Sequence, residues 1–127
     1  MKENLMVTAT FDFAIQVMTL ANALRERKEY DLASQFWRAG TSIGANVEEA
    51  QAAQSRADFQ SKMSIAAKEA RETRYWLRLA GGGNILPPAK VQPLLNEIES
   101  ILRTLTSIVK TTSESKIQNP KFKLSPP

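Results

Sequence analysis

Three arginines in the segment 57–84 are the side chains of this sequence best placed to do chemistry. Arg71, Arg74 and Arg78 are spaced three and four residues apart, so in a helix they share one face. Lys68 and Tyr75 lie nearby. A row of guanidinium groups can neutralise successive phosphates, which predicts contact with RNA or DNA. The alternative is an ordinary solvated face whose charges form some intramolecular pairs.

A second set of positive charges lies near the C-terminus. Residues 114–127 contain proline and carry Lys116, Lys121 and Lys123 against Glu114 alone. This composition predicts a basic, flexible tail after a folded domain of residues 1–113. The net charge of +4 permits contact with nucleic acid without requiring it. Because no aromatic platform interleaves with the arginines, we expect little sequence specificity.

A mixed polar cluster lies on the flanks of two predicted helices. Four polar residues from Arg38 to Glu49 follow one another at three- and four-residue spacing. Glu69 and Glu72 lie among large apolar residues, and a partly buried carboxylate needs a partner. We predict a network that fixes the register of the two helices. Replacing Arg38 by alanine should then cost about 3 kcal/mol or more. The predicted network consists of Arg38, Ser42, Asn46, Glu49, Glu69 and Glu72.

The composition excludes several kinds of active site. The chain has no cysteine and no histidine, which rules out disulfides, thiolate zinc sites, cysteine nucleophiles, histidine bases and Glu-x-x-His di-iron sites. The polar cluster lacks a nucleophile–base pair and a phosphate loop, so we expect no enzymatic activity and no cofactor. Glu48, Glu49, Glu69 and Glu72 could hold a divalent metal, but scattered carboxylates on helices are commonly solvated or paired, and we expect none.

Helix-period spacing of apolar residues recurs four times, at roughly 8–28, 31–54, 56–80 and 89–112, without strand alternation. Ser55 with Asp58 predicts the start of the third helix, and the glycines at 81–83 predict its end. Long helices with short loops predict an all-α, antiparallel up-down-up-down four-helix bundle. Asp12 and Gln16 interrupt the apolar N-terminal segment, so we expect no signal peptide, no membrane span and a cytoplasmic location.

The stretch RAGTSIGANVEEA, residues 38–50, places two glycines inside the second helix. Each costs a helix about 1 kcal/mol relative to alanine. Gly40 and Gly44 are four residues apart and lie on one flank of the apolar seam, with Val47 close by. They predict a surface without side chains, against which another helix packs closely.

The fourth helix has a wider apolar face than one bundle seam needs. Leu95, Leu102 and Val109 form a seven-residue series beside the main one. One explanation is a deeply buried helix. The other is a second seam against another protomer, which makes these residues the candidate oligomer interface.

Two long motifs carry a resemblance to a known family. LASQFWRAGTSIGANVEEA and SRADFQSKMSIAAKEARETRYWLRLA are similar to the four-helix-bundle proteins encoded in intervening sequences of bacterial large-subunit ribosomal RNA genes. The resemblance covers roughly residues 10–112. The family usually has Ile-Ala-Glu-Gly after the asparagine, whereas this chain has Val47-Glu48-Glu49-Ala50. The matching residues are Arg38, Ser42, Ile43, Asn46, Glu49, Ala50, Ser55, Asp58, Phe59, Ile65, Ala66, Glu72, Thr73 and Leu77.

The resemblance implies a ring-shaped homo-oligomer, typically a pentamer, with a channel and a basic outer surface. Related accessory proteins of diversity-generating retroelements bind nucleic acid and reverse transcriptase, and the family has no established enzymatic activity. Together with the arginine row, this favours a non-enzymatic, oligomeric protein that binds RNA or DNA. The alternative is a scaffold ring that binds a partner protein and has no nucleic-acid role.

Overall fold

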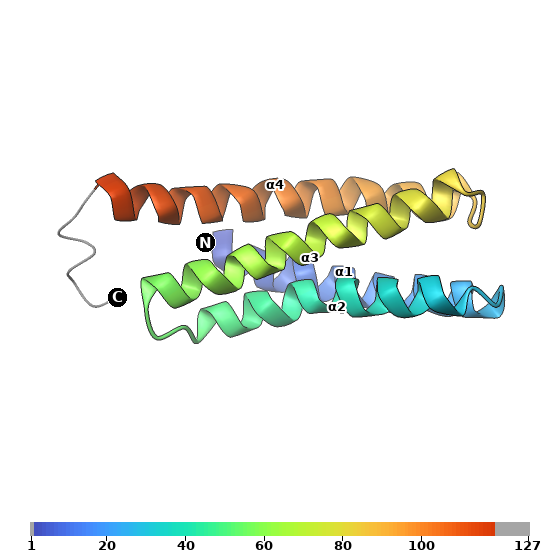
Figure 1. Ribbon diagram of the computed structural model, residues 1–127, viewed down its shortest axis with the longest axis horizontal. Coiled ribbons are helices and arrows are strands. Elements are labelled where there is room, and N and C mark those ends of the chain that lie inside the picture. The colour runs from blue at the N-terminus through green and yellow to red at the C-terminus, as the bar shows by residue number, and fades with distance from the viewer. Residues whose placement is uncertain (1, 119–127) are drawn as a thin grey trace.

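Four helices make up the computed structural model of this protein, which describes residues 2–118 (Figure 1). They are α1 (Lys2–Glu26), α2 (Tyr30–Gln51), α3 (Arg56–Gly82) and α4 (Pro88–Gln118), and the described residues include no strand. Successive helices run in opposite directions, and each contacts its neighbours in the chain, with α4 packing back against α1. The predicted all-α, up-down-up-down bundle is therefore confirmed.

The helix ends differ from prediction mainly at the two termini. Helix α1 begins at Lys2 instead of residue 8, and α4 continues to Gln118, past the predicted boundary at residue 113. Lys116 thus belongs to α4, whereas Lys121 and Lys123 lie outside the described residues. The segment after residue 112 contains no glycine or proline until Pro120, so nothing in it forces the helix to stop earlier.

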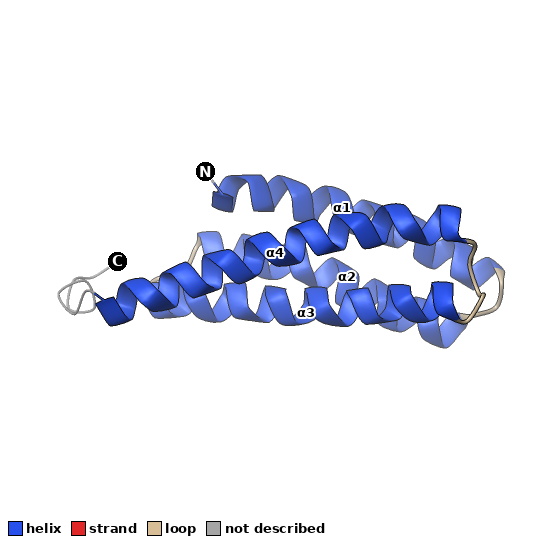
Figure 2. Ribbon diagram, turned by 90° about the horizontal axis from the view of Figure 1, so that it is seen from above, coloured by secondary structure: helices blue, strands red, loops and turns tan. Residues whose placement is uncertain are grey.

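Short connections join the helices, as Figure 2 shows. The Ser55 hydroxyl accepts a hydrogen bond from the Asp58 amide at 3.0 Å, which is the predicted cap of α3. At the other end of α3 the Gly83 amide donates to the Leu79 carbonyl at 2.8 Å. Lys28 and Asn84 take left-handed backbone conformations, with φ of 65° and 57°, and turn the chain into α2 and toward α4.

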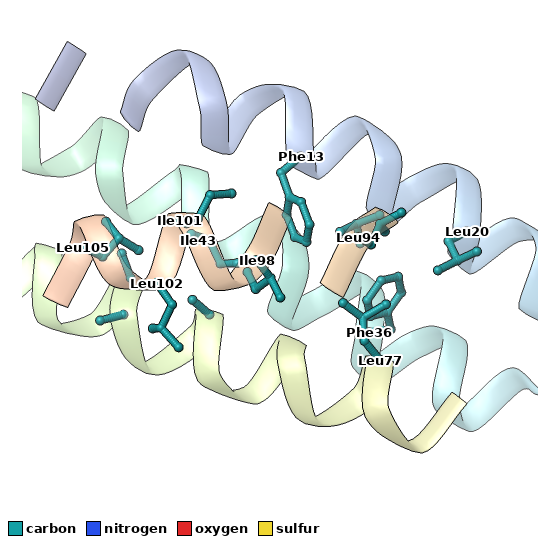
Figure 3. Packing of buried hydrophobic residues seen from close by; sticks show 14 of the residues in the cluster. Phe13, Leu20, Phe36, Ile43, Leu77, Leu94, Ile98, Ile101, Leu102 and Leu105 are labelled. Carbon is teal, nitrogen blue, oxygen red and sulfur yellow. The ribbon is translucent and has the colours of Figure 1, made fainter. Parts of the chain in front are cut away.

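Apolar side chains from all four helices meet along the bundle axis (Figure 3). Phe13, Phe36, Leu77 and Ile98 are each less than 2% exposed, one from each helix in turn. Each of them lies in one of the four segments whose apolar spacing predicts a helix, where residues three and four apart share one face. The apolar faces that the sequence spacing predicts therefore meet in the core.

The two glycines of α2 lie against α1. A Cβ atom at Gly40 would stand 2.6 Å from both γ-methyl groups of Val17, and one at Gly44 would stand 3.2 Å from the Thr10 carbonyl oxygen. Both contacts are closer than side chains normally allow, so the predicted close approach of a neighbouring helix is present. At the glycines, the backbone of α2 packs directly against α1. This close packing offsets the low helix propensity of the glycines.

One stretch of α1, Asn4–Glu26, is long and apolar enough by length and composition to cross a membrane, with a mean hydropathy of 1.3. The sequence analysis expected no segment of this length and hydropathy. Core helices can have the same composition, and here Phe13, Val17, Leu20 and Leu24 are buried inside the bundle.

We predict that Gly40→Ala destabilises the protein. Overpacking against the stiff, buried Val17 should cost about 1–3 kcal/mol, more than the ~1 kcal/mol that alanine gains in helix propensity. Gly82→Ala is the matched control, since no atom lies within 4 Å of its added Cβ. Urea unfolding at one fixed protein concentration measures both. If Gly40→Ala were as stable as Gly82→Ala, the close approach would not constrain the fold.

Candidate nucleic-acid interface

A groove between α3 and α4 carries five cationic side chains on its walls. Arg71, Arg74 and Arg78 come from α3, and Arg103 and Lys110 come from α4. Three hollows make up this α3–α4 groove, and two of them share Thr106 and Lys110. The third continues toward the connection between the two helices, beside Arg78.

Helical spacing explains why these residues line one surface. The three arginines lie on the flank of α3 that faces α4, because Glu69 and Glu72 on the other flank contact α2. Arg103 and Lys110 are seven residues apart on α4, which is about two turns and returns to the same face. The sequence analysis did not name these two residues as site residues. Their seven-residue spacing, which places both on one face of a helix, could have indicated them.

Most of the positive charge in the groove is not neutralised. The Arg74 guanidinium lies 3.1 Å from the Glu99 carboxylate, and Glu99 is the one acidic side chain among the described residues that line the groove. Within residues 4–113, Arg71, Arg78, Arg103 and Lys110 form no ion pair, and all four are exposed. Four cations without an ion pair to the described side chains are therefore available to an anionic ligand.

Lys68 is exposed on α3 but does not line the α3–α4 groove. Tyr75 was expected to lie near the arginines without forming an aromatic platform. Its side chain is 52% exposed and lies one helical turn from both Arg71 and Arg78. Tyr75 is therefore an exposed aromatic residue beside the charges, as its position in the sequence indicates.

The candidate oligomer residues border the same groove. Leu95, Leu102 and Val109 each line one of its hollows. Leu102 is only 8% exposed and points into the core, as Figure 3 shows, while Leu95 and Val109 are half-buried against that core. The buried-helix explanation therefore describes Leu102, and the three residues do not form an exposed apolar surface.

The polar cluster braces α2 against α3. One guanidinium nitrogen of Arg38 donates to Glu69 Oε1 at 3.3 Å, and the other donates to Glu72 Oε2 and to the Gln35 side chain. The Trp76 indole N–H also donates to Glu72 Oε2, at 3.0 Å. The structure thus brings Arg38 to both predicted carboxylates and adds two partners that the sequence pattern did not indicate.

Three predicted members of this network do not join it. The Ser42 hydroxyl and the Asn46 amide donate to carbonyls one turn earlier in α2, at 2.6 and 2.9 Å, and Glu49 is exposed. Arg38 itself is 49% exposed, so we expect its loss to cost less than the removal of one partner from a fully buried pair. Among the described residues, no group of three or more acidic side chains could hold a metal ion.

These features define a helical-bundle protein with an open basic groove between α3 and α4 and with ion pairs that join α2 to α3. The sequence model described as 23S rRNA-intervening sequence protein matches residues 2–107, and the chain belongs to this family. The family resemblance seen in the sequence is therefore confirmed.

A solved structure supports the same conclusion. It is a protein of unknown function from the S23 ribosomal protein family of Bacteroides thetaiotaomicron VPI-5482, 41% identical to this chain. The match covers 87% of this chain and 99% of that one, with a TM-score of 0.83. No curated protein matches the chain.

We predict that Arg38→Ala lowers the free energy of unfolding by about 1–2 kcal/mol, because two mostly buried carboxylates, 14% and 29% exposed, lose a charged donor that is itself half exposed. Arg103→Ala is the control, since Arg103 is an exposed helical arginine without an ion pair to any side chain of residues 4–113. It should change stability by less than about 0.5 kcal/mol. Equal effects of the two substitutions in urea unfolding would show that the brace adds nothing.

Proposed function

We propose that this protein is a non-enzymatic, homo-oligomeric bundle that binds RNA or DNA through the α3–α4 groove. The observation that supports this most directly is the charge of the groove, where five cations face one carboxylate. Phosphates are the anions that a row of exposed guanidinium groups binds best, because each group offers several donors in one plane. The family membership is consistent with a role near RNA but does not itself assign one.

The arrangement favours contact with the sugar–phosphate backbone. Arg71 and Arg78 are separated by two helical turns, about 10 Å along the axis, so both can reach one strand. Backbone contacts position a nucleic acid without reading its sequence, so binding should vary little with sequence. Lys116, Lys121 and Lys123 add to the positive charge of the chain and should contribute less.

A second candidate function, a protein-binding scaffold, has its own supporting observation. Phe11, Ile15 and Met18 are spaced four and three residues apart on α1, and all three are exposed. They form an apolar stripe on the outer face of α1, which we call the α1 stripe. Contiguous exposed apolar surface is typical of protein contacts. We assign one side of the proposed contact between protomers, in a ring of five by family resemblance, to this stripe in place of the series containing the buried Leu102. A ring also needs a second, different surface on each protomer to receive the stripe.

We predict that replacing Arg71 and Arg78 together by glutamine removes most binding to oligonucleotides. Each lost phosphate contact should also reduce the slope of log affinity against log salt by about 0.9 for a duplex. Arg27→Gln with Lys28→Gln at the α1–α2 turn removes the same charge elsewhere and should have a small effect. Fluorescence anisotropy from about 50 to 200 mM salt, where counterion release is readily seen, measures both pairs.

Two outcomes would contradict this prediction. If the unmodified protein bound neither RNA nor DNA at the low-salt end, the nucleic-acid function would be wrong and the scaffold function would remain. If both double substitutions weakened binding equally, the net charge and not the groove would be responsible.

We predict that Ile15→Glu dissociates the oligomer while leaving the bundle helical, because a charge in an apolar contact cannot be desolvated cheaply. Leu5→Glu is the control, since Leu5 is exposed on α1 but lies at least about 80° around the helix from the stripe. Sedimentation velocity measures the mass against the 14.1 kDa chain. Sedimentation of the unmodified protein as a monomer at micromolar concentration would refute self-association.

A further inference from the structure

We infer that Tyr75 is a base-stacking platform and that the α3–α4 groove takes single-stranded nucleic acid in preference to a duplex. This inference rests on the proposed nucleic-acid function and names the class of ligand for the same surface. It begins with the position of Tyr75 on α3, four residues after Arg71 and three before Arg78. At 1.5 Å per residue, the two arginines lie about 6 Å and 4.5 Å from Tyr75 along the helix axis.

The surroundings of Tyr75 hold the ring while leaving it accessible. Its centroid lies 5.3 Å from that of Trp76 at an interplanar angle of 65°, an edge-to-face contact. Trp76 is fixed in turn through its indole N–H on Glu72, which Arg38 binds. The Tyr75 side chain is nevertheless 52% exposed, so one contact restrains the ring without covering it. A restrained, exposed ring loses little entropy when a base stacks on it.

A hollow beside the ring has room for the rest of a nucleotide. Tyr75 lines it together with Arg78, Leu79, Pro88 and the glycines at 81 and 82. The glycines bring no side chain into this space, and a Cβ added at Gly82 would meet nothing within 4 Å. The lining combines apolar carbon with one cation, which suits a flat aromatic base joined to a phosphate.

Base stacking is what distinguishes the two forms of nucleic acid. In a duplex each base already stacks on its neighbours and is held by its pair, so its ring faces are not free for Tyr75. An unpaired base can rotate out and stack on the side chain, with the flanking phosphates directed to Arg71 and Arg78. Stacking tolerates any base, because every base has a π-face, so the preference for single strands adds no sequence specificity.

The test compares an unstructured oligothymidine strand with a duplex of the same length, at about 50 mM salt, where phosphate contacts are strong. The unmodified protein should bind the single strand more tightly. Tyr75→Ala should weaken single-strand binding about fivefold or more, the lower end of what one stacked base contributes, and should leave duplex binding nearly unchanged. Tyr75→Phe keeps the ring and should bind like the unmodified protein.

Two further variants make the result specific. Tyr75→Leu keeps apolar bulk against Trp76 without an aromatic ring, so it should lose single-strand preference even if Tyr75→Ala folds poorly. Tyr30→Ala removes an exposed tyrosine of α2 and should change nothing, because Tyr30 does not line the groove. Circular dichroism of each variant separates loss of binding from loss of fold.

The outcomes separate the two proposals. Absence of binding to either oligonucleotide would refute the nucleic-acid function itself. Equal affinity for strand and duplex, or full single-strand binding by Tyr75→Leu, would refute the stacking role while leaving phosphate binding in place. If the oligonucleotide bound only after the oligomer had dissociated into monomers, a second copy of the chain, and not a nucleic acid, would occupy the groove in the assembled protein.

Discussion

The rotation of α3 about its own axis is the constraint on which the charged surfaces of this protein depend. Met63, Ala66, Ala70 and Leu77 turn one narrow face of the helix into the core. The flank on one side then carries Glu69 and Glu72 to α2, and the flank on the other carries the arginines to α4. A shift of one residue would rotate these flanks by about 100° and carry charges toward the core. The ion pairs from Arg38 to Glu69 and Glu72 oppose that shift. These pairs add only modestly to stability, and their main effect is to fix the register of α3 against α2.

Small residues make this arrangement possible. Gly40 and Gly44 bring α1 against α2, and alanines occupy much of the buried face of α3. Helices that approach closely let long side chains on their flanks reach across to the next helix, as Arg38 does from α2 and Arg74 does toward Glu99 on α4. The apolar interior thus determines which polar groups can meet, and the cost of glycine in a helix is offset by packing.

Helical spacing predicts the core and the bundle because one repeat governs both, but it leaves local choices open. Ser42 and Asn46 share a flank with Arg38, yet their side chains bond to carbonyls of their own helix, a nearby partner that spacing alone does not reveal. Leu102 and Arg103 follow one another on α4, and only the position of α3 shows that the first is buried and the second lines the groove. The end of α4 was missed because polar residues after Thr112 resemble a tail while still permitting a helix.

The chain order places two different surfaces on different helices of the bundle. Residues 1–51, which form α1 and α2, carry five basic and seven acidic side chains, whereas residues 52–127 carry twelve and six. The α1 stripe lies on the acidic half and the α3–α4 groove on the basic half. Self-association through Leu95 and Val109 would cover the groove and exclude a nucleic acid from it. Self-association of the α1 stripe with any surface other than the groove would leave every groove open, and repeating a weak phosphate-binding site around an oligomer raises its avidity without any new contact. The two proposed properties are therefore compatible when the contact between protomers leaves the α3–α4 groove uncovered, as a contact through the α1 stripe can.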